Sequence, residues 1–182
     1  MTESEEKRPV VFFDRDGVLI RDKNYQINVD EIELFADTAE ALKTLDLKFR
    51  KIIVSNQSGV GRGYFSAEDV GEFNKYLAGI LAGHDIEIDG WYFCPHLPDD
   101  NCECRKPGIG MITQAAEEFE IDIKNSWLIG DKSTDIMAGR TAGAKTILLN
   151  TGYAGEDGGP SDVSPDYRAD NLLMAVKLIN RS

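Results

Sequence analysis

The chain has 182 residues with 20 basic and 32 acidic side chains, a formal net charge of −12, and 42% hydrophobic residues. This balance is typical of a globular protein and excludes intrinsic disorder, and the length favours one domain, 1–182, whose core needs no disulfide. The negative charge argues against nucleic acid and anionic membranes as partners, because both would be repelled.

The apolar runs and the cysteines of the chain both indicate the cytoplasm as its compartment. No run of about 18 uncharged apolar residues could span a membrane, and the polar stretch 1–9 lacks the apolar segment of a signal peptide. Three cysteines within 94–104 are an odd number and too clustered for a disulfide framework. We therefore expect a cytoplasmic protein, and we expect it to be a monomer.

Short apolar runs alternate with helical patterns along the chain. In chain order they predict a strand at 10–13, a helix at 38–47, a strand at 51–54, a helix at 66–82, a strand at 91–93, a helix at 108–119, a strand at 127–129, a helix at 133–142, a strand at 146–149, a Gly/Pro/Asp-rich loop at 152–166 and a helix at 171–179. Ser66 and Asp69 form a weak capping box at one helix start, and Gly83 can end that helix. The alternation predicts an α/β fold, a doubly wound parallel sheet of Rossmann type with helices on both faces.

Three of the expected strands end in polar side chains. Because ligands of open α/β sheets bind outside the carboxyl ends of the strands, we expect these side chains to meet. They are Asp14 and Asp16 after the first strand, Ser55 and Asn56 after the second, and Asp131, Lys132 and Asp135 after the fourth.

The carboxylates of this group suit a divalent cation. Asp14 and Asp16 are two residues apart in an extended chain, so both side chains point the same way. Adjacent carboxylates repel unless a cation or a proton separates them, and adding Asp131 gives an oxygen-rich site for Mg²⁺. The alternative for Asp-x-Asp-Gly alone is a solvated turn, but its position after a buried strand favours a functional site.

A phosphate ester beside Mg²⁺ also requires a nucleophile, a proton donor and groups that hold the phosphoryl oxygens. Asp14 can be the nucleophile, and Asp16 can protonate the leaving oxygen and then deprotonate water. The Ser55 hydroxyl and nearby backbone N–H groups can hold the phosphoryl group. Either Lys106 or Lys132 can neutralise its charge.

The order of these motifs resembles that of the haloacid-dehalogenase-like (HAD) phosphatases over residues 10–150. The motifs that carry the resemblance are Asp14-Arg15-Asp16-Gly17-Val18-Leu19, Ser55-Asn56-Gln57, Arg105-Lys106-Pro107 and Gly130-Asp131-Lys132-x-x-Asp135. The resemblance implies an aspartyl-phosphate intermediate on Asp14, with Asp16 as acid/base, Ser55 holding the phosphoryl group and Lys106 stabilising its charge.

The same resemblance assigns the magnesium ligands. They are the Asp14 carboxylate, the Asp16 backbone carbonyl and Asp131, while Asp135 is expected to brace the metal waters or Lys132. A chain of this length leaves no room for the large cap domain found in some members.

A second metal site is expected in the loop 94–104, which holds every cysteine. Four ligands, Cys94, His96, Cys102 and Cys104, suit tetrahedral Zn²⁺ in a structural role, although their spacing is not that of a zinc finger. The alternative is three free thiols, which would be prone to oxidation. We hypothesise that zinc stiffens this loop and so holds Arg105 and Lys106 at the active site.

The Cys/His loop makes the chain similar to the branch that contains the D-glycero-D-manno-heptose-1,7-bisphosphate 7-phosphatases and the bacterial histidinol-phosphate phosphatases. The first implies a phosphorylated sugar as substrate, in lipopolysaccharide or S-layer heptose synthesis, and histidinol phosphate is the alternative. The expected substrate-binding residues are Asn56, Arg62, Arg105 and Lys132, with the two arginines as candidates for a distal phosphate.

Two readings from other classes are a non-enzymatic phospho-acceptor domain of receiver type and a zinc-stabilised binding module with a dead site. Asp16 argues against the first, because a phosphoryl group that is merely stored needs no general acid. The binding module with a dead site is disfavoured because every catalytic position of the motifs is filled.

Overall fold

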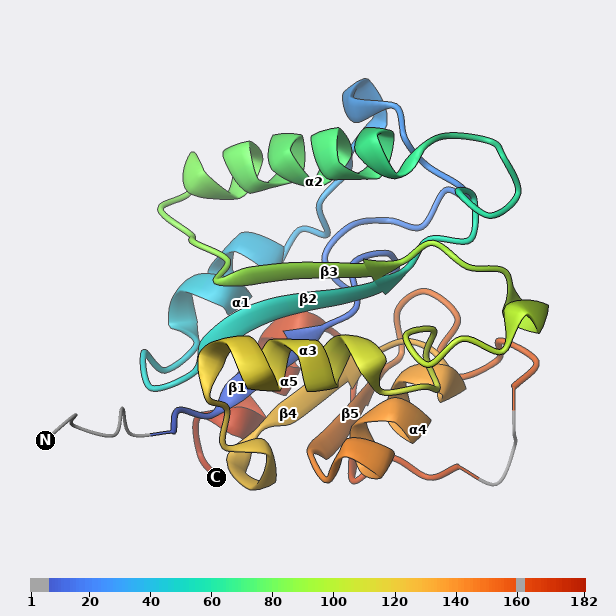
Figure 1. The fold of residues 1–182 in the computed structure, drawn as a ribbon. Coiled ribbons are helices and arrows are strands. Elements are labelled where there is room, and N and C mark those ends of the chain that lie inside the picture. The colour runs from blue at the N-terminus through green and yellow to red at the C-terminus, as the bar shows by residue number, and fades with distance from the viewer. Residues whose placement is uncertain (1–6, 160–162) are drawn as a thin grey trace, which may run out of the picture.

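A six-stranded sheet organises the computed structural model, which describes residues 7–159 and 163–182 (Figure 1). The strand order is β3-β2-β1-β4-β5-β6, and every neighbouring pair is parallel. The strands are β1 (Val10–Phe13), β2 (Arg50–Asn56), β3 (Gly90–Cys94), β4 (Trp127–Gly130), β5 (Lys145–Leu149) and β6 (Tyr167–Ala169). The order reverses between β1 and β4, which confirms the predicted doubly wound topology.

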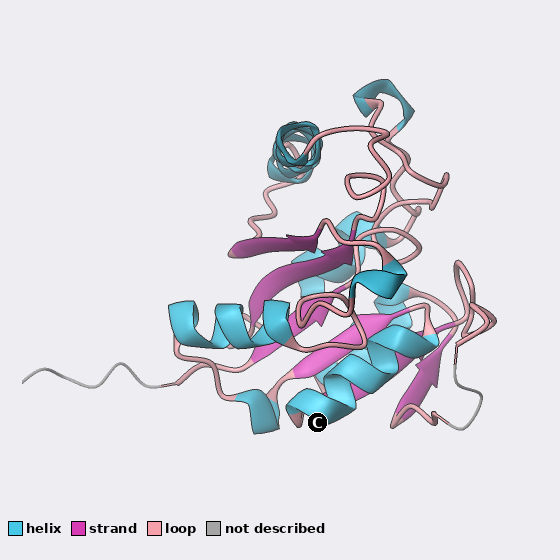
Figure 2. Ribbon diagram, turned by 45° about the vertical axis from the view of Figure 1, so that its right-hand side comes forward, coloured by secondary structure: helices cyan, strands magenta, loops and turns pink. Residues whose placement is uncertain are grey.

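Helices cover both faces of the sheet (Figure 2). One hydrophobic core is shared by side chains of three helices, α1 (Thr38–Thr44), α2 (Ala67–Ala82) and α5 (Leu172–Ile179). The other core and the strands beside it are contacted mainly by α3 (Gly110–Phe119) and α4 (Ser133–Ala142). Short 3-10 turns lie at Val29–Glu31, Pro98–Asp100 and Ile123–Asn125.

Strand β1 shows why a continuous apolar run forms the centre of this sheet. All four residues of β1 are fully buried, with Val11 and Phe13 in one core and Val10 and Phe12 in the other. Because successive side chains point to opposite faces and both faces are covered, every position must be apolar.

Helix α2 begins at the predicted capping box. The Ser66 hydroxyl accepts the Asp69 N–H at 3.1 Å, and the Asp69 carboxylate accepts the Ser66 N–H at 2.8 Å. The buried face includes Phe73 and Leu77, at the spacing of an amphipathic helix. Among the residues that the structure describes, no helix is both long enough and apolar enough to cross a membrane.

Several boundaries differ from the sequence prediction. Strand β2 extends to Asn56, because Ser55 and Asn56 pair with Phe93 and Cys94 of β3 instead of starting a loop. Helix α1 ends at Thr44 and not near residue 47, and the Asp46 carboxylate there accepts the Lys48 N–H in a turn. Strand β6 and the 3-10 turns were not predicted, since three or fewer apolar positions give no periodic signal.

Parallel pairing brings the carboxyl ends of β1, β2, β3 and β4 to one edge of the sheet. Asp14 follows β1, Ser55 lies near the end of β2, Cys94 ends β3 and Asp131 follows β4. The predicted metal and phosphate residues therefore share this edge.

Candidate active site

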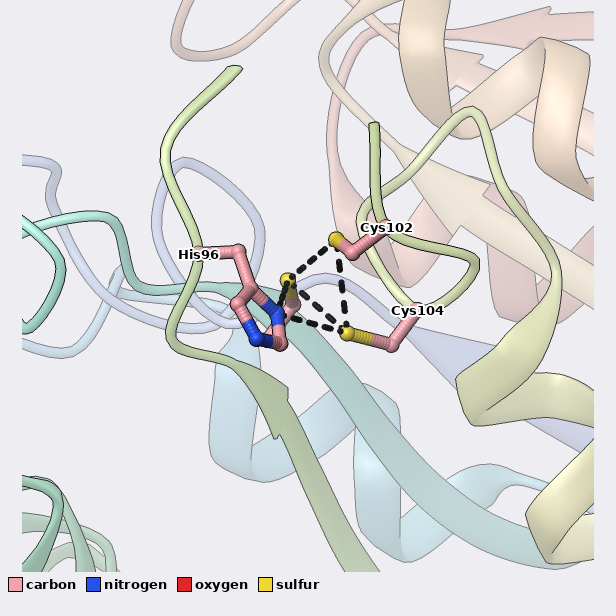
Figure 3. Close-up of side chains that lie close together, drawn as sticks. His96, Cys102 and Cys104 are labelled. Atoms are coloured by element: carbon pink, nitrogen blue, oxygen red, sulfur yellow. Dashed lines mark hydrogen bonds between the residues drawn. The ribbon is translucent and has the colours of Figure 1, made fainter. Parts of the chain in front are cut away.

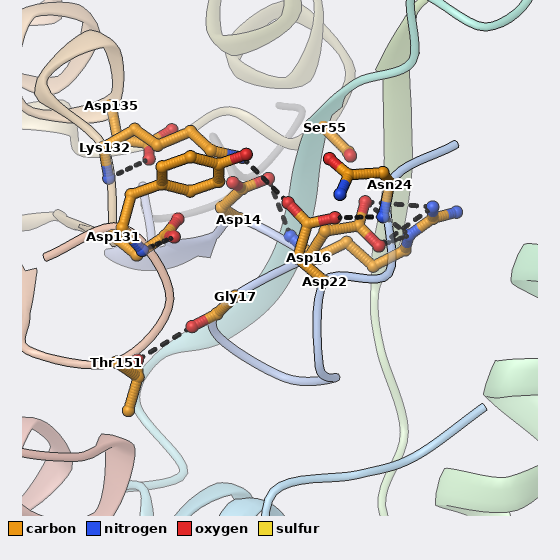
Figure 4. A network of polar contacts seen from close by, with 12 residues as sticks. Asp14, Asp16, Gly17, Asp22, Asn24, Ser55, Asp131, Lys132, Asp135 and Thr151 are labelled. Atoms are coloured by element: carbon orange, nitrogen blue, oxygen red, sulfur yellow. Dashed lines mark hydrogen bonds and ion pairs between the residues drawn. The ribbon is translucent and has the colours of Figure 1, made fainter. Parts of the chain in front are cut away.

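Three buried carboxylates converge beyond the ends of β1 and β4 (Figure 4). Asp14, Asp131 and Asp135 each offer an oxygen, and these oxygens all lie within 4.8 Å of one another. Asp14 is 4% exposed, and the other two are fully buried. A cavity of about 680 Å³ opens beside them, and Asp14, Asp16 and Asp135 line it. Asp135 is therefore part of the same cluster as Asp14 and Asp131, the two carboxylates expected to ligate magnesium.

Lys106 is the cation of this cluster. Its Nζ lies 3.0 Å from Oδ1 of Asp14 and 2.7 Å from Oδ1 of Asp135, and it donates to the Val54 carbonyl at 2.7 Å. Burial lowers the pKa of Lys106, but the Asp135 and Asp14 carboxylates outweigh it, so the net pKa is raised. Lys106 is therefore protonated, and its charge faces the carboxylate predicted to attack phosphorus.

Asp131 retains an unsatisfied oxygen in the centre of the site. Its Oδ2 accepts the Tyr153 N–H at 2.8 Å, whereas its buried Oδ1 has no hydrogen-bond partner among the described residues. Burial, followed by the Asp14 carboxylate, raises the pKa of Asp131 to about 7. A divalent cation would both ligate this oxygen and offset the crowded negative charge. The residues present therefore fit Mg²⁺, a hard ion that prefers carboxylate oxygens.

Asp16, two residues after Asp14, lines the same cavity. Its Oδ2 accepts hydrogen bonds from Arg15 Nη2 at 2.9 Å and from Gln57 Nε2 at 2.8 Å. Gln57 also donates to the Ser55 hydroxyl at 2.7 Å, so one amide joins the expected acid/base to the expected phosphoryl-binding residue. Arg15 and Gln57 lie inside the motifs at the ends of β1 and β2, but no role was expected for either from the sequence.

The four expected substrate-binding residues do not all reach the cavity. Asn56, Arg105 and Lys132 line it, whereas Arg62 is not among the lining residues. The Arg62 guanidinium instead lies 5.6 Å from the ring centre of Tyr25, which does line the cavity. The structure therefore does not bring Arg62 to the position expected for it.

Lys132 and Arg105 are each tied to a neighbouring loop. Lys132 Nζ lies 3.4 Å from Oδ2 of Asp22, and the four carboxylates around it outweigh burial and raise its pKa (Figure 4). Arg105 Nη1 donates to the His96 carbonyl at 3.3 Å. Both cations line the cavity.

The loop after β5 completes the site, although the sequence indicated only a loop at 152–166, of which 160–162 lie outside the described residues. The Thr151 hydroxyl donates to the Gly17 carbonyl at 2.8 Å, and the Gly155 N–H donates to the Asp131 carbonyl at 2.7 Å. The Asp157 carboxylate accepts the Ser133 N–H at 2.9 Å at the start of α4. In the sequence, the only sign that this loop belongs to the site was its position after a parallel strand next to β4.

The predicted zinc ligands also converge (Figure 3). Cys94, His96, Cys102 and Cys104 each offer a ligand atom within 4.8 Å of the others. The sulfur–sulfur distances are 3.1 Å for Cys94–Cys104 and 3.6 Å for the other two pairs, and His96 Nδ1 lies 3.2 Å from Cys104 Sγ.

This spacing fits a tetrahedral metal centre. Zinc–sulfur bonds of ~2.3 Å in a tetrahedron separate the sulfurs by roughly 3.8 Å, close to the 3.6 Å of two pairs, whereas Cys94 and Cys104 lie nearer each other at 3.1 Å. Burial, followed by the Cys104 thiol, raises the pKa of Cys94, and a bound cation would reverse this shift by stabilising the thiolate. The donor set of three thiols and one imidazole suits Zn²⁺.

Comparisons with known proteins agree with this geometry. Residues 103–175 match the family model described as "HAD-hyrolase-like". A D-glycero-beta-D-manno-heptose-1,7-bisphosphate 7-phosphatase of Pasteurella multocida is 37% identical over 180 residues, covering 94% of this chain and 97% of that protein. The probable D-glycero-D-manno-heptose-1,7-bisphosphate 7-phosphatase of Thermoplasma acidophilum is 46% identical over 123 residues, covering 67% of this chain and 77% of that protein.

A solved structure shares the same fold over nearly the whole chain. The D,D-heptose 1,7-bisphosphate phosphatase of B. bronchiseptica, complexed with magnesium and phosphate, aligns with a TM-score of 0.84 and 26% identity. The alignment covers 95% of this chain and 98% of that one. By sequence and by fold, the chain belongs to the HAD-like phosphatase family, in the branch that contains the heptose-1,7-bisphosphate 7-phosphatases.

Proposed function

We propose that the protein is a Mg²⁺-dependent phosphatase that removes the 7-phosphate of D-glycero-D-manno-heptose 1,7-bisphosphate through an aspartyl-phosphate on Asp14. The observation that carries the proposal is the buried cluster of Asp14, Asp131 and Asp135 with Lys106, beside a cavity that Asp14, Asp135 and Lys106 line. The names of the relatives supply the substrate.

Magnesium would be held by Asp14 and Asp131, with the Asp16 carbonyl as the third protein ligand. The bound ion would lower the negative charge around the phosphoryl group and so admit an anionic nucleophile. Oδ1 of Asp131, which has no hydrogen-bond partner within residues 7–159 and 163–182, supports this assignment.

The Asp14 carboxylate is oriented by two donors. Its Oδ1 accepts hydrogen bonds from both the Arg15 N–H at 2.8 Å and Lys106 Nζ at 3.0 Å. In the proposed reaction this carboxylate attacks phosphorus as the bond from phosphorus to the sugar oxygen breaks. Lys106 fixes the orientation of the carboxylate and stabilises the charge of the phosphoryl group.

Asp16 moves the proton in both steps. It first gives a proton to the departing sugar oxygen, and the aspartyl-phosphate forms on Asp14. It then takes a proton from water, whose oxygen attacks phosphorus and releases inorganic phosphate and the free Asp14 carboxylate. The Ser55 hydroxyl, which already accepts from Gln57 at 2.7 Å, is placed to donate to a phosphoryl oxygen.

The protein is inferred to work as a single-domain cytoplasmic monomer with structural zinc in the loop 94–104. All three cysteines are free thiols in one cluster, an arrangement suited to a reducing compartment and to a metal. Atomic absorption for zinc, and light scattering for the molecular mass, test these two points.

The substrate is tested by comparing kcat/KM for the α and β anomers of the heptose 1,7-bisphosphate with kcat/KM for histidinol phosphate at saturating Mg²⁺. We expect one heptose anomer to be preferred and Asp14→Asn to abolish turnover while the circular dichroism spectrum is unchanged. A preference for histidinol phosphate would overturn the substrate, and near-normal turnover by Asp14→Asn would move the nucleophile elsewhere.

A further inference from the structure

Arg15 is a buried cation next to the expected general acid. The residue is 1% exposed, and its guanidinium contacts the Asp16 carboxylate through Nη2 and Nε, with distances to Oδ2 of 2.9 Å and 3.2 Å. A buried charge costs several kcal/mol unless it is fully paired. The side chain is therefore held in this position by the groups around it.

The remaining contacts of Arg15 come from helix α2, about 60 residues further along the chain. Nη1 donates to the Asn74 side-chain oxygen at 2.8 Å, and the guanidinium carbon lies 4.4 Å from the ring centre of Phe73. Asn74 and Phe73 are both buried. Helix α2 thus holds one edge and one face of the guanidinium, while Asp16 takes another edge.

We propose that Arg15 is a positioning residue for Asp16, and that Asn74 of α2 fixes Arg15 in turn. The proposal rests on the acid/base role of Asp16 in the proposed function. Two N–H groups in a rigid fork fix the plane of a carboxylate as well as its position. Gln57 adds a third donor at 2.8 Å, so Asp16 is restricted to one orientation at the cavity.

A positioning role of Arg15 and a purely structural role predict different effects on two kinds of substrate. A lost fork would let Asp16 rotate, and a displaced proton donor harms departure of a sugar alkoxide far more than departure of a nitrophenolate, which needs no proton. A merely structural arginine would lower turnover of both substrates alike. The leaving-group dependence therefore reports the role of Arg15.

The test compares kcat/KM for the heptose bisphosphate and for 4-nitrophenyl phosphate in Arg15→Met and Asn74→Ala, because kcat/KM reports the departure of the alcohol and not the later hydrolysis that both substrates share. We expect Arg15→Met to lower kcat/KM on the sugar phosphate by about 100-fold, a typical result of a misplaced catalytic group, with a much smaller loss on the aryl phosphate. Asn74→Ala should show the same pattern in milder form, and it carries the test if Arg15→Met does not fold.

Two matched controls are available. Lys75→Ala changes the exposed neighbour of Asn74 on the same helix. Arg50→Met removes another arginine that stacks on a phenylalanine, Phe119, and pairs with Asp89 away from the site. Both should keep the activity of the unaltered protein on both substrates.

The Asp16→Asn background decides whether Arg15 acts through Asp16. There, Arg15→Met should add no further loss on either substrate. A further loss in that background, or equal losses on the two substrates in the single variants, would overturn the proposal. If Asp16→Asn alone reduced kcat/KM equally for both substrates, the general-acid assignment would fall and this inference with it, which separates the two failures.

Discussion

Asn56 and Lys106 are joined by two hydrogen bonds between side chain and backbone. The Asn56 amide nitrogen donates to the Lys106 carbonyl at 3.0 Å, and its amide oxygen accepts the Lys106 N–H at 3.0 Å. Asn56 ends β2, so this pair attaches the backbone of Lys106 to the sheet. Although Asn56 lines the cavity, both ends of its amide are occupied, and we infer a positioning role instead of the expected substrate contact.

The first prediction concerns this pair. Asn56→Ala frees the backbone of Lys106, so we expect kcat to fall by roughly 10–100-fold, as for other displaced catalytic groups, while KM changes little. Steady-state kinetics on the heptose bisphosphate measure both constants. Asn125→Ala, which removes an exposed amide bonded to Asp122, is the control. A rise in KM at constant kcat would instead make Asn56 a substrate ligand.

The second prediction concerns Gly152 and the magnesium ligand Asp131. A Cβ on Gly152 would lie 2.1 Å from Asp131 Oδ2, and its φ of +55° disfavours other residues. Gly152→Ala should therefore displace Asp131 and weaken metal binding by roughly 10–100-fold. Electron paramagnetic resonance measures this affinity with Mn²⁺ in place of Mg²⁺.

Gly158 of the same loop supplies the control for this experiment. Its φ is +73°, but a Cβ there meets nothing within 4 Å. Gly158→Ala adds the backbone strain without the clash and should leave Mn²⁺ affinity unchanged. Equal weakening in both variants would attribute the effect to the loop backbone and not to Asp131.

The third prediction concerns the loop 94–104. Cys102→Ser removes one of the four clustered donors, so we expect zinc to be lost and kcat to fall, because Arg105 and Lys106 follow the cluster directly. Zinc content and kcat are measured on the same preparation. Asp99→Ala changes an exposed residue of the same loop and should keep both. Full turnover without zinc would show that the loop positions these cations by itself.

The fourth prediction concerns the capping box of α2. Ser66→Ala removes the hydroxyl that accepts the Asp69 N–H, and such a loss costs about 1 kcal/mol of unfolding free energy. Urea unfolding at pH 7 measures it. Glu68→Gln, an exposed substitution in the same turn, should change the unfolding free energy much less.

The capping box of Ser66 and Asp69 also makes the stability of the fold depend on pH, in a defined direction. Hydrogen bonds from the Ser66 N–H and hydroxyl lower the pKa of Asp69 below its ordinary 3.8. A carboxylate with a lowered pKa in the folded state stabilises the fold above its unfolded pKa, and this stabilisation is lost as the pH falls through the folded pKa. Asp69→Asn should therefore be less stable than the unaltered protein at pH 7, and the difference should shrink below pH 3.8. A constant difference would exclude the carboxylate charge as its source.

The sequence by itself was sufficient for the features that depend on local pattern or on a general rule of topology. The apolar run of β1 and the alternation of elements predicted the parallel sheet, because both faces of such a sheet must be covered. Once the sheet was predicted, the rule that carboxyl ends of parallel strands share an edge brought Asp14 and Asp131 together. The zinc ligands lie within 94–104, so chain proximity alone limits how far apart they can be.

Only the tertiary structure decided which side chains hold these groups in place. The contact of Arg15 with Asn74, the two hydrogen bonds of Asn56 with Lys106 and the packing of Gly152 on Asp131 join segments distant along the chain. Arg62 was expected at the cavity but lies on Tyr25 instead. Such contacts depend on how each loop leaves its strand, and loop conformation carries no periodic signal in the sequence.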